Sequence, residues 1–200
     1  INYSTYLVIA WLRFRAVRSV SWKTQLANLG IGKNLKHIIF VMLYNESWEV
    51  VETTLAAIAN AVYDKEKFVV VIAGEDRQAQ NFQTVYTKAY KNFSDKFHAV
   101  LGTLHPSDLP DEIPGKASNL NFSEQEVDSY IIEQGWDKKE VIATIFDTDA
   151  ICHSEYFAYL TYVYVKHPNP TKSSYQPIPF YNNNIWESPA ILRLMAYGTS

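Results

Sequence analysis

The chain has 200 residues, of which 48% are apolar and 20% are charged, and its formal net charge at pH 7 is −3. This length and composition predict one globular domain with a substantial core, and the near-neutral charge gives no reason to expect a nucleic-acid partner. The only cysteine is Cys152, which excludes an internal disulfide and a cysteine-based zinc site.

Residues 1–36 are predicted to form a basic N-terminal arm, because this segment contains six Lys or Arg and no Asp or Glu. Its stretch TYLVIAWLRFR is apolar, is too short to span a bilayer and continues directly into arginines. Two interpretations remain open: the end of a membrane helix, or an amphipathic helix packed on the domain. The first would place the rest of the protein at the cytoplasmic face of a membrane, since basic segments beside a span usually stay on that side.

From His37 onward, short apolar runs alternate with segments of helical periodicity. The run VVVI lacks a polar/apolar alternation, which is typical of a strand buried on both faces in a parallel sheet. We expect strands at 37–44, 67–77, 98–105 and 140–146, helices at 47–63, 77–93 and 154–167, a helix in the later part of 116–135, and loop with a short strand at 168–184. Alternation of this kind predicts a doubly wound α/β fold, in which ligands bind at the carboxyl ends of the strands.

Polar and acidic residues collect at these strand ends. Two of the acids, Asp147 and Asp149, are one residue apart at the end of the fourth apolar run, where we expect the chain to turn into a loop. In such a turn both carboxylates can reach one hard cation, Mg²⁺ or Mn²⁺, which would neutralise a diphosphate. The alternative is a plain turn in which Asp149 caps the next helix. The other strand ends carry Tyr44, Asn45 and Glu46, and Glu75 and Asp76.

The motifs LYNES, VVVIAGEDR, GKASNLN and IFDTDA occur in this order between His37 and Asn184, followed by QPIPFYNN. With this set the chain resembles the family 2-like GT-A fold glycosyltransferases, which include cellulose, chitin and hyaluronan synthases. The resemblance implies a GT-A sandwich, an α/β domain with a mostly parallel central sheet, of which residues 37–200 would be the donor-binding half.

The resemblance also implies a role for each matching residue. Tyr44 and Glu46 would border the base and ribose of the donor, and Asp76 would bind its uracil or ribose. Lys116 and Asn119 would line the same pocket. At the fourth strand, Asp147 would face the ribose and diphosphate, and Asp149, with Asp147, would ligate Mg²⁺ or Mn²⁺.

The implied activity is the metal-assisted, inverting transfer of a sugar from a nucleoside diphosphate sugar, expected to be UDP-linked, to a hydroxyl of a glycan or lipid-linked acceptor. The chain departs from the family pattern at Leu43, where a proline is common, and at Glu75, where an aspartate is usual. The catalytic base is expected beyond Ser200, with both ends of the protein cut, and Glu187 is the one later candidate within the chain.

Two other functions compete with this one. A phosphatase of the haloacid dehalogenase type also carries Asp-x-Asp after an apolar strand, but its motif ordinarily lies on the first strand rather than the fourth. A non-catalytic module that binds a nucleotide sugar would carry the same donor motifs without the base.

Overall fold

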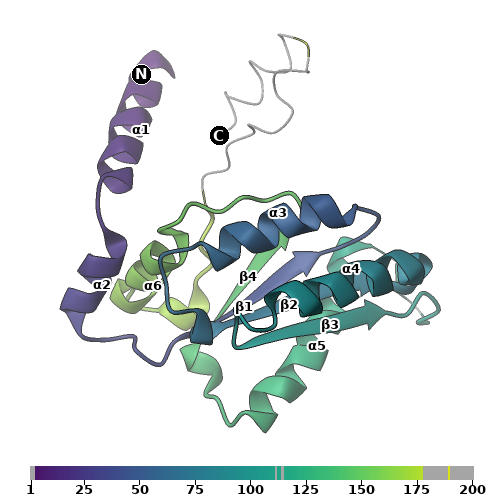
Figure 1. The fold of residues 1–200 in the computed structure, drawn as a ribbon. Coiled ribbons are helices and arrows are strands. Elements are labelled where there is room, and N and C mark those ends of the chain that lie inside the picture. The colour runs from purple at the N-terminus through teal and green to yellow at the C-terminus, as the bar shows by residue number, and fades with distance from the viewer. Residues whose placement is uncertain (1–2, 111, 114, 178–188, 190–200) are drawn as a thin grey trace. The chain divides into compact units, whose positions relative to one another are not determined.

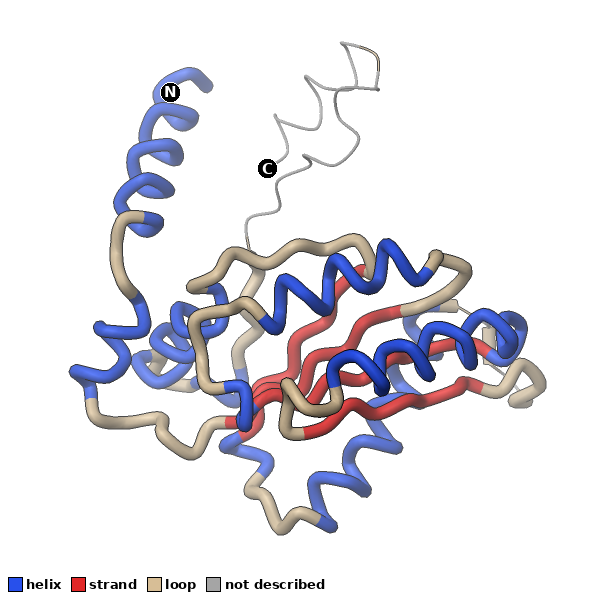
Figure 2. The backbone as a smooth tube through the Cα atoms, in the orientation of Figure 1, coloured by secondary structure: helices blue, strands red, loops and turns tan. Residues whose placement is uncertain are grey.

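The computed structural model describes residues 3–110, 112–113, 115–177 and 189. Strands and helices alternate from residue 36 onward, as the sequence predicts (Figure 2). The strands are β1 (Lys36–Met42), β2 (Phe68–Glu75), β3 (Ala99–His105) and β4 (Val141–Asp147). The helices are α1 (Tyr3–Arg18), α2 (Trp22–Leu29), α3 (Trp48–Ala59), α4 (Ala79–Phe93), α5 (Lys116–Glu133) and α6 (Tyr156–Lys166).

The four strands form one parallel sheet in the order β3-β2-β1-β4. Met42 of β1 pairs with Ala73 on one side and with Asp147 on the other, and Glu75 of β2 pairs with His105 of β3. The carboxyl ends of all four strands therefore lie at one edge of the sheet. The domain is thus an α/β fold with helices on both faces of a parallel sheet (Figure 1).

Two apolar clusters hold the helices on the sheet. On one face, α3, α4 and α6 pack on the strands, with residues such as Leu55, Val85 and Phe157 fully or almost fully buried. On the other face, α5 packs through Val127 and Ile131. Every residue of β2 is buried, because this central strand is covered on both faces, as its unbroken apolar run predicts.

One side of β4 differs from the rest of the sheet. The burial of β4 alternates, and its residues Ala143, Ile145 and Asp147 are exposed on the side of the sheet that carries α5. Ile145 is 47% exposed. Because successive side chains of a strand point to opposite faces, this register directs Asp147 toward the α5 side.

Three segments refine the sequence predictions. Helix α5 begins at Lys116, so the first part of the 116–135 segment is helical as well. The basic arm contains two helices, and α2 packs on α6 through the ring of Trp22, whose centroid lies 4.4 Å from that of Tyr159. The segment 169–177 has one short 3₁₀ turn, Pro170–Lys172, and no strand, while 178–184 lies outside the described residues.

Candidate functional site

The two aspartates lie in a tight turn at the end of β4, where the sequence predicts that the chain leaves the strand. The amide of Ala150 donates a hydrogen bond to the carbonyl of Asp147 at 3.0 Å. Between the aspartates, Thr148 is buried, and its carbonyl accepts a 2.6 Å hydrogen bond from the hydroxyl of Thr54 on α3. Both aspartate side chains are exposed on either side of this anchored residue. The turn therefore presents two carboxylates to solvent from a fixed backbone.

Helix capping does not account for Asp149. The next helix, α6, begins at Tyr156, and the residue before it in the cap position is Glu155. Asp149 lies six residues before that cap, so the interpretation of Asp149 as the cap of the following helix is wrong.

Lys116, the first residue of α5, forms an ion pair with Asp147. Its ammonium donates to Oδ1 of Asp147, and the two side chains are 54% and 68% exposed. Exposed ion pairs of this kind contribute little to stability, because water screens both charges. The pair places the Lys116 ammonium beside the Asp-Thr-Asp turn. Either side chain can exchange the other for a different partner at a small cost in free energy.

The turn carries side chains of the type that could hold a cation such as Mg²⁺. In the described part of the chain, no three His, Cys, Asp or Glu side chains converge on a point that could hold a metal ion. Mg²⁺, however, is commonly bound by one or two carboxylates, with water and substrate phosphates at its other positions. The exposed oxygens of Asp147 and Asp149 are suitable ligands for such an ion. Water and the phosphates of a substrate would complete its coordination.

The segment after β1 is held in a defined conformation. The backbone amide of Tyr44 donates to Oε2 of Glu46 at 2.9 Å. From α4, the side-chain amide of Asn81 donates to the carbonyl of Glu46 at 3.1 Å. The Tyr44 ring remains 46% exposed at the carboxyl edge of the sheet. This exposed aromatic ring is a suitable surface for stacking a flat ligand group.

The end of β2 contributes a second charged group at this edge. Arg77 donates through Nε to Glu75 at 3.0 Å and through a second guanidinium nitrogen to the same oxygen, and this hydrogen bonding raises the pKa of Arg77. The guanidinium lies 5.5 Å from the centre of the Tyr44 ring. Asp76 is exposed and accepts a 3.2 Å hydrogen bond from Ser107. Glu75, by contrast, is almost fully buried, so Asp76 is the more accessible carboxylate.

Asn119 occupies a different environment from the other predicted site residues. It is buried on α5, and its amide donates to the carbonyl of Ala73 at 3.0 Å. Ser123, one helical turn further on, donates to Asn119 at 3.3 Å and lies 2.7 Å from the hydroxyl of Thr103. These bonds fasten the first turns of α5 to β2 and β3. Asn119 therefore positions the helix that carries Lys116.

Two residues of the site were missed by reasoning from sequence. Thr54 lies on the buried face of α3, where a hydroxyl requires a partner, and that requirement was the available signal. Arg77 directly follows two acids in the sequence, but that local pattern carries no signal for its position over Tyr44. Both contacts join segments that are far apart in the sequence.

Cys152 and His153 follow the turn but do not form a reactive pair. Burial raises the pKa of the Cys152 thiol to about 11, so it stays protonated at neutral pH. The exposed His153 accepts a hydrogen bond from the backbone amide of Glu155 at 3.2 Å. These contacts offer no thiolate nucleophile.

No protein-family model and no curated protein matches this chain. The site is therefore interpreted from its own geometry and chemistry.

Proposed function

We propose that this domain binds a nucleoside diphosphate sugar and serves as the donor-binding part of a metal-assisted glycosyltransferase. The observation that carries the proposal is the turn at Asp147–Ala150, which presents two exposed carboxylates at the carboxyl edge of a parallel sheet. This edge is where α/β sheets bind their ligands. An anionic donor would require a cation between its phosphates and these two carboxylates.

The other groups at the edge suit the remaining parts of such a donor. Tyr44 offers an exposed ring for a base, and Asp76 offers an accessible carboxylate that could accept hydrogen bonds from a ribose or a base. Lys116 supplies an ammonium beside Asp147, within reach of a phosphate held at the same turn. These three residues come from the ends of different elements, and the sheet brings those ends to one side.

Mg²⁺ or Mn²⁺ bound by Asp147 and Asp149 would supply charge neutralisation for the departing nucleoside diphosphate. The protein residues orient the donor and hold this cation, and Thr54 fixes the backbone between the two ligands. The acceptor hydroxyl requires a separate base. Glu187, the candidate base within the chain, lies outside the described residues.

The decisive test is calorimetric titration of UDP into the protein with and without Mn²⁺. We expect UDP to bind with Mn²⁺ present and to bind at least about tenfold more weakly without it, because the diphosphate would then face uncompensated carboxylates. Asp149→Asn should give a similar loss with Mn²⁺ present. Mn²⁺ binding followed by electron paramagnetic resonance should weaken in the same variant.

A matched control is Asp95→Asn, which removes one exposed carboxylate in the segment before β3, at the opposite edge of the sheet. This variant should bind UDP as the wild type does. Binding of GDP but not UDP would change the nucleotide and leave the donor site in place. Absence of binding of any nucleoside diphosphate to the folded protein would refute the proposal. Tight metal-independent binding would favour a nucleotide-binding module without metal-assisted transfer.

A further inference from the structure

Helix α1 exposes apolar side chains all around its axis. None of its side chains that the structure describes is buried. With 3.6 residues per turn, the exposed apolar positions between residues 6 and 12 are spread around the helix rather than along one stripe. A stripe would fit a single protein face, whereas an all-round distribution suits a surrounding apolar phase. The side chains concerned are Tyr6, Val8, Ile9, Trp11 and Leu12, each between 44% and 59% exposed.

The charges of α1 are separated from its apolar residues along the helix axis. Arg13, Arg15 and Arg18 all lie in the second half of the helix, and Arg15 and Arg18 are in its last turn. The chain contains no Asp or Glu before Glu46. The helix thus has an apolar first part and a cationic second part, without acidic side chains in its own sequence to neutralise the arginines.

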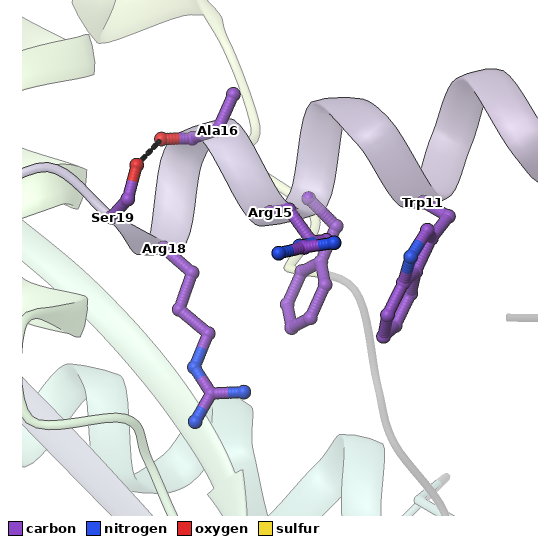
Figure 3. Close-up of a pocket in the computed structure, with 6 residues that line it drawn as sticks. Trp11, Arg15, Ala16, Arg18 and Ser19 are labelled. Carbon is purple, nitrogen blue, oxygen red and sulfur yellow. Dashed lines mark hydrogen bonds between the residues drawn. The ribbon is translucent and has the colours of Figure 1, made fainter.

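Aromatic rings lie where these two parts meet. The rings of Trp11 and Phe14 have centroids 5.9 Å apart. Trp11 and Arg15 lie on the same side of the helix (Figure 3). Together with Arg18 and Ser19 they line a shallow hollow of about 570 Å³. Tryptophan is enriched at membrane interfaces, where its ring remains in the apolar zone near the headgroups. Arginine beside it would meet the lipid phosphates.

We infer that α1 docks the protein on an anionic lipid bilayer, with residues 6–12 in the outer apolar layer and the three arginines at the phosphates. At 1.5 Å per residue, the distance along the axis from Tyr6 to Arg13 is about 10 Å, which is less than the roughly 15 Å of hydrocarbon in one leaflet. Among the described helices, none has the length and hydropathy to cross a bilayer. The docking rests on α1 alone and does not depend on the proposed donor site.

The test is co-sedimentation of the protein with vesicles of phosphatidylcholine, either pure or containing about 30% phosphatidylserine, as a model of an anionic leaflet. We expect binding to the mixed vesicles that is at least about tenfold tighter than binding to the neutral ones and that weakens with salt. Arg13→Gln/Arg15→Gln/Arg18→Gln should lower the partition coefficient on mixed vesicles about a hundredfold, since each basic residue contributes roughly fivefold. Trp11→Ser/Leu12→Ser should weaken binding at least about tenfold to both kinds of vesicle.

Matched controls come from α4 and the loop after it. Lys88→Gln/Lys91→Gln/Lys96→Gln removes the same number of positive charges, and Tyr90→Ser removes an aromatic ring that is 54% exposed. Both controls should bind vesicles as the wild type does. Equal binding by the α1 variants and the wild type, or equal losses in the controls, would overturn the inference. A second pattern of results would also overturn it: a wild-type protein that forms a dimer and does not bind vesicles, and a Trp11→Ser/Leu12→Ser variant that is monomeric. A second copy of the chain would then be the partner of α1.

Discussion

At the residue scale, His37 shows how burial fixes a protonation state. Its ring is fully buried at the start of β1, with the rings of Tyr63, Phe68 and Phe157 edge-on within 5.7 Å. Nε2 lies 2.9 Å from the hydroxyl of Thr161, and Nδ1 has no hydrogen-bond partner among the described residues. Burial, with a smaller effect of the Lys67 cation, lowers the pKa of His37 from 6.5 to about 3. The histidine is therefore neutral in the folded protein at neutral pH.

This lowered pKa predicts that acid destabilises the fold. In the unfolded chain His37 takes up a proton below about pH 6.5, whereas in the folded chain it resists protonation until about pH 3. The contribution of His37 to the free energy of unfolding is complete above pH 6.5 and is lost as the pH falls. Between pH 8 and pH 5 the loss should be about 2 kcal/mol. Denaturant unfolding at several pH values, compared with His37→Phe, measures this contribution as a difference.

The control for this comparison is His153→Gln, which removes an exposed histidine. It should keep the wild-type dependence on pH, because the His153 side chain is exposed to water in the folded protein as it is in the unfolded chain. If the wild-type and His37→Phe curves remained parallel from pH 8 to pH 5, His37 would not be the origin of the acid sensitivity.

At the element scale, two glycines allow α4 to approach the sheet. The rings of Phe82 and Tyr86 are stacked, with centroids 5.7 Å apart, over Gly74 of β2 and Gly102 of β3. A methyl group on Gly102 would lie 2.8 Å from two atoms of the Tyr86 ring. Carbon atoms do not approach so closely without displacement, so the absence of a side chain on these strands sets the position of α4.

Gly102→Ala should therefore destabilise the domain by about 1–3 kcal/mol, the usual cost of overpacking a tight core contact. The measurement is the free energy of unfolding in urea. In a Tyr86→Ala background, Gly102→Ala should lower the free energy of unfolding by less than it does in the wild type, because the clashing ring is absent. Gly115→Ala is the control, since no atom of the described residues, its chain neighbours aside, lies within 4 Å of its added methyl group and its φ of 165° is extended backbone. Equal stability of Gly102→Ala and the wild type would contradict this packing argument.

At the scale of the whole molecule, the sheet order determines which strands are protected. Strands β1 and β2 are central, with a strand on each side, whereas β3 and β4 each pair with one strand of the described residues. The two central strands also have apolar packing on both faces. Their amides should therefore exchange only when the domain unfolds.

Amide hydrogen exchange followed by mass spectrometry tests this expectation. We expect peptides of β1 and β2 to exchange at least about a hundredfold more slowly than peptides of α1, whose described side chains are not buried. Peptides of β3 should lie between these extremes. Protection of α1 equal to that of β1 in the absence of lipid would contradict the exposure of this helix.

Much of the fold was predictable from the sequence because its signals are local. The unbroken apolar run 68–73 predicted a strand covered on both faces, and β2 is buried throughout. Helical spacing predicted that Phe82, Val85, Tyr86, Ala89 and Phe93 share one side of the helix at 77–93. In α4 four of them are buried and Tyr86 is half-buried. The change from an apolar run to acids at Asp147 and Asp149 predicted the end of a strand, and the chain turns there. Each of these features depends on residues that are close neighbours in the chain.

The sequence by itself determined which segments become strands and helices and that acids follow the strand ends, because periodicity and polarity act over a few residues. Only the tertiary structure decided which of those residues meet. The ion pair of Lys116 with Asp147 and the bond of Thr54 to the turn join segments 31 and 94 residues apart. Arg77 reaches Tyr44 because β1 and β2 are neighbours in the sheet. Such contacts follow from strand order and register, which the packing of the whole core selects.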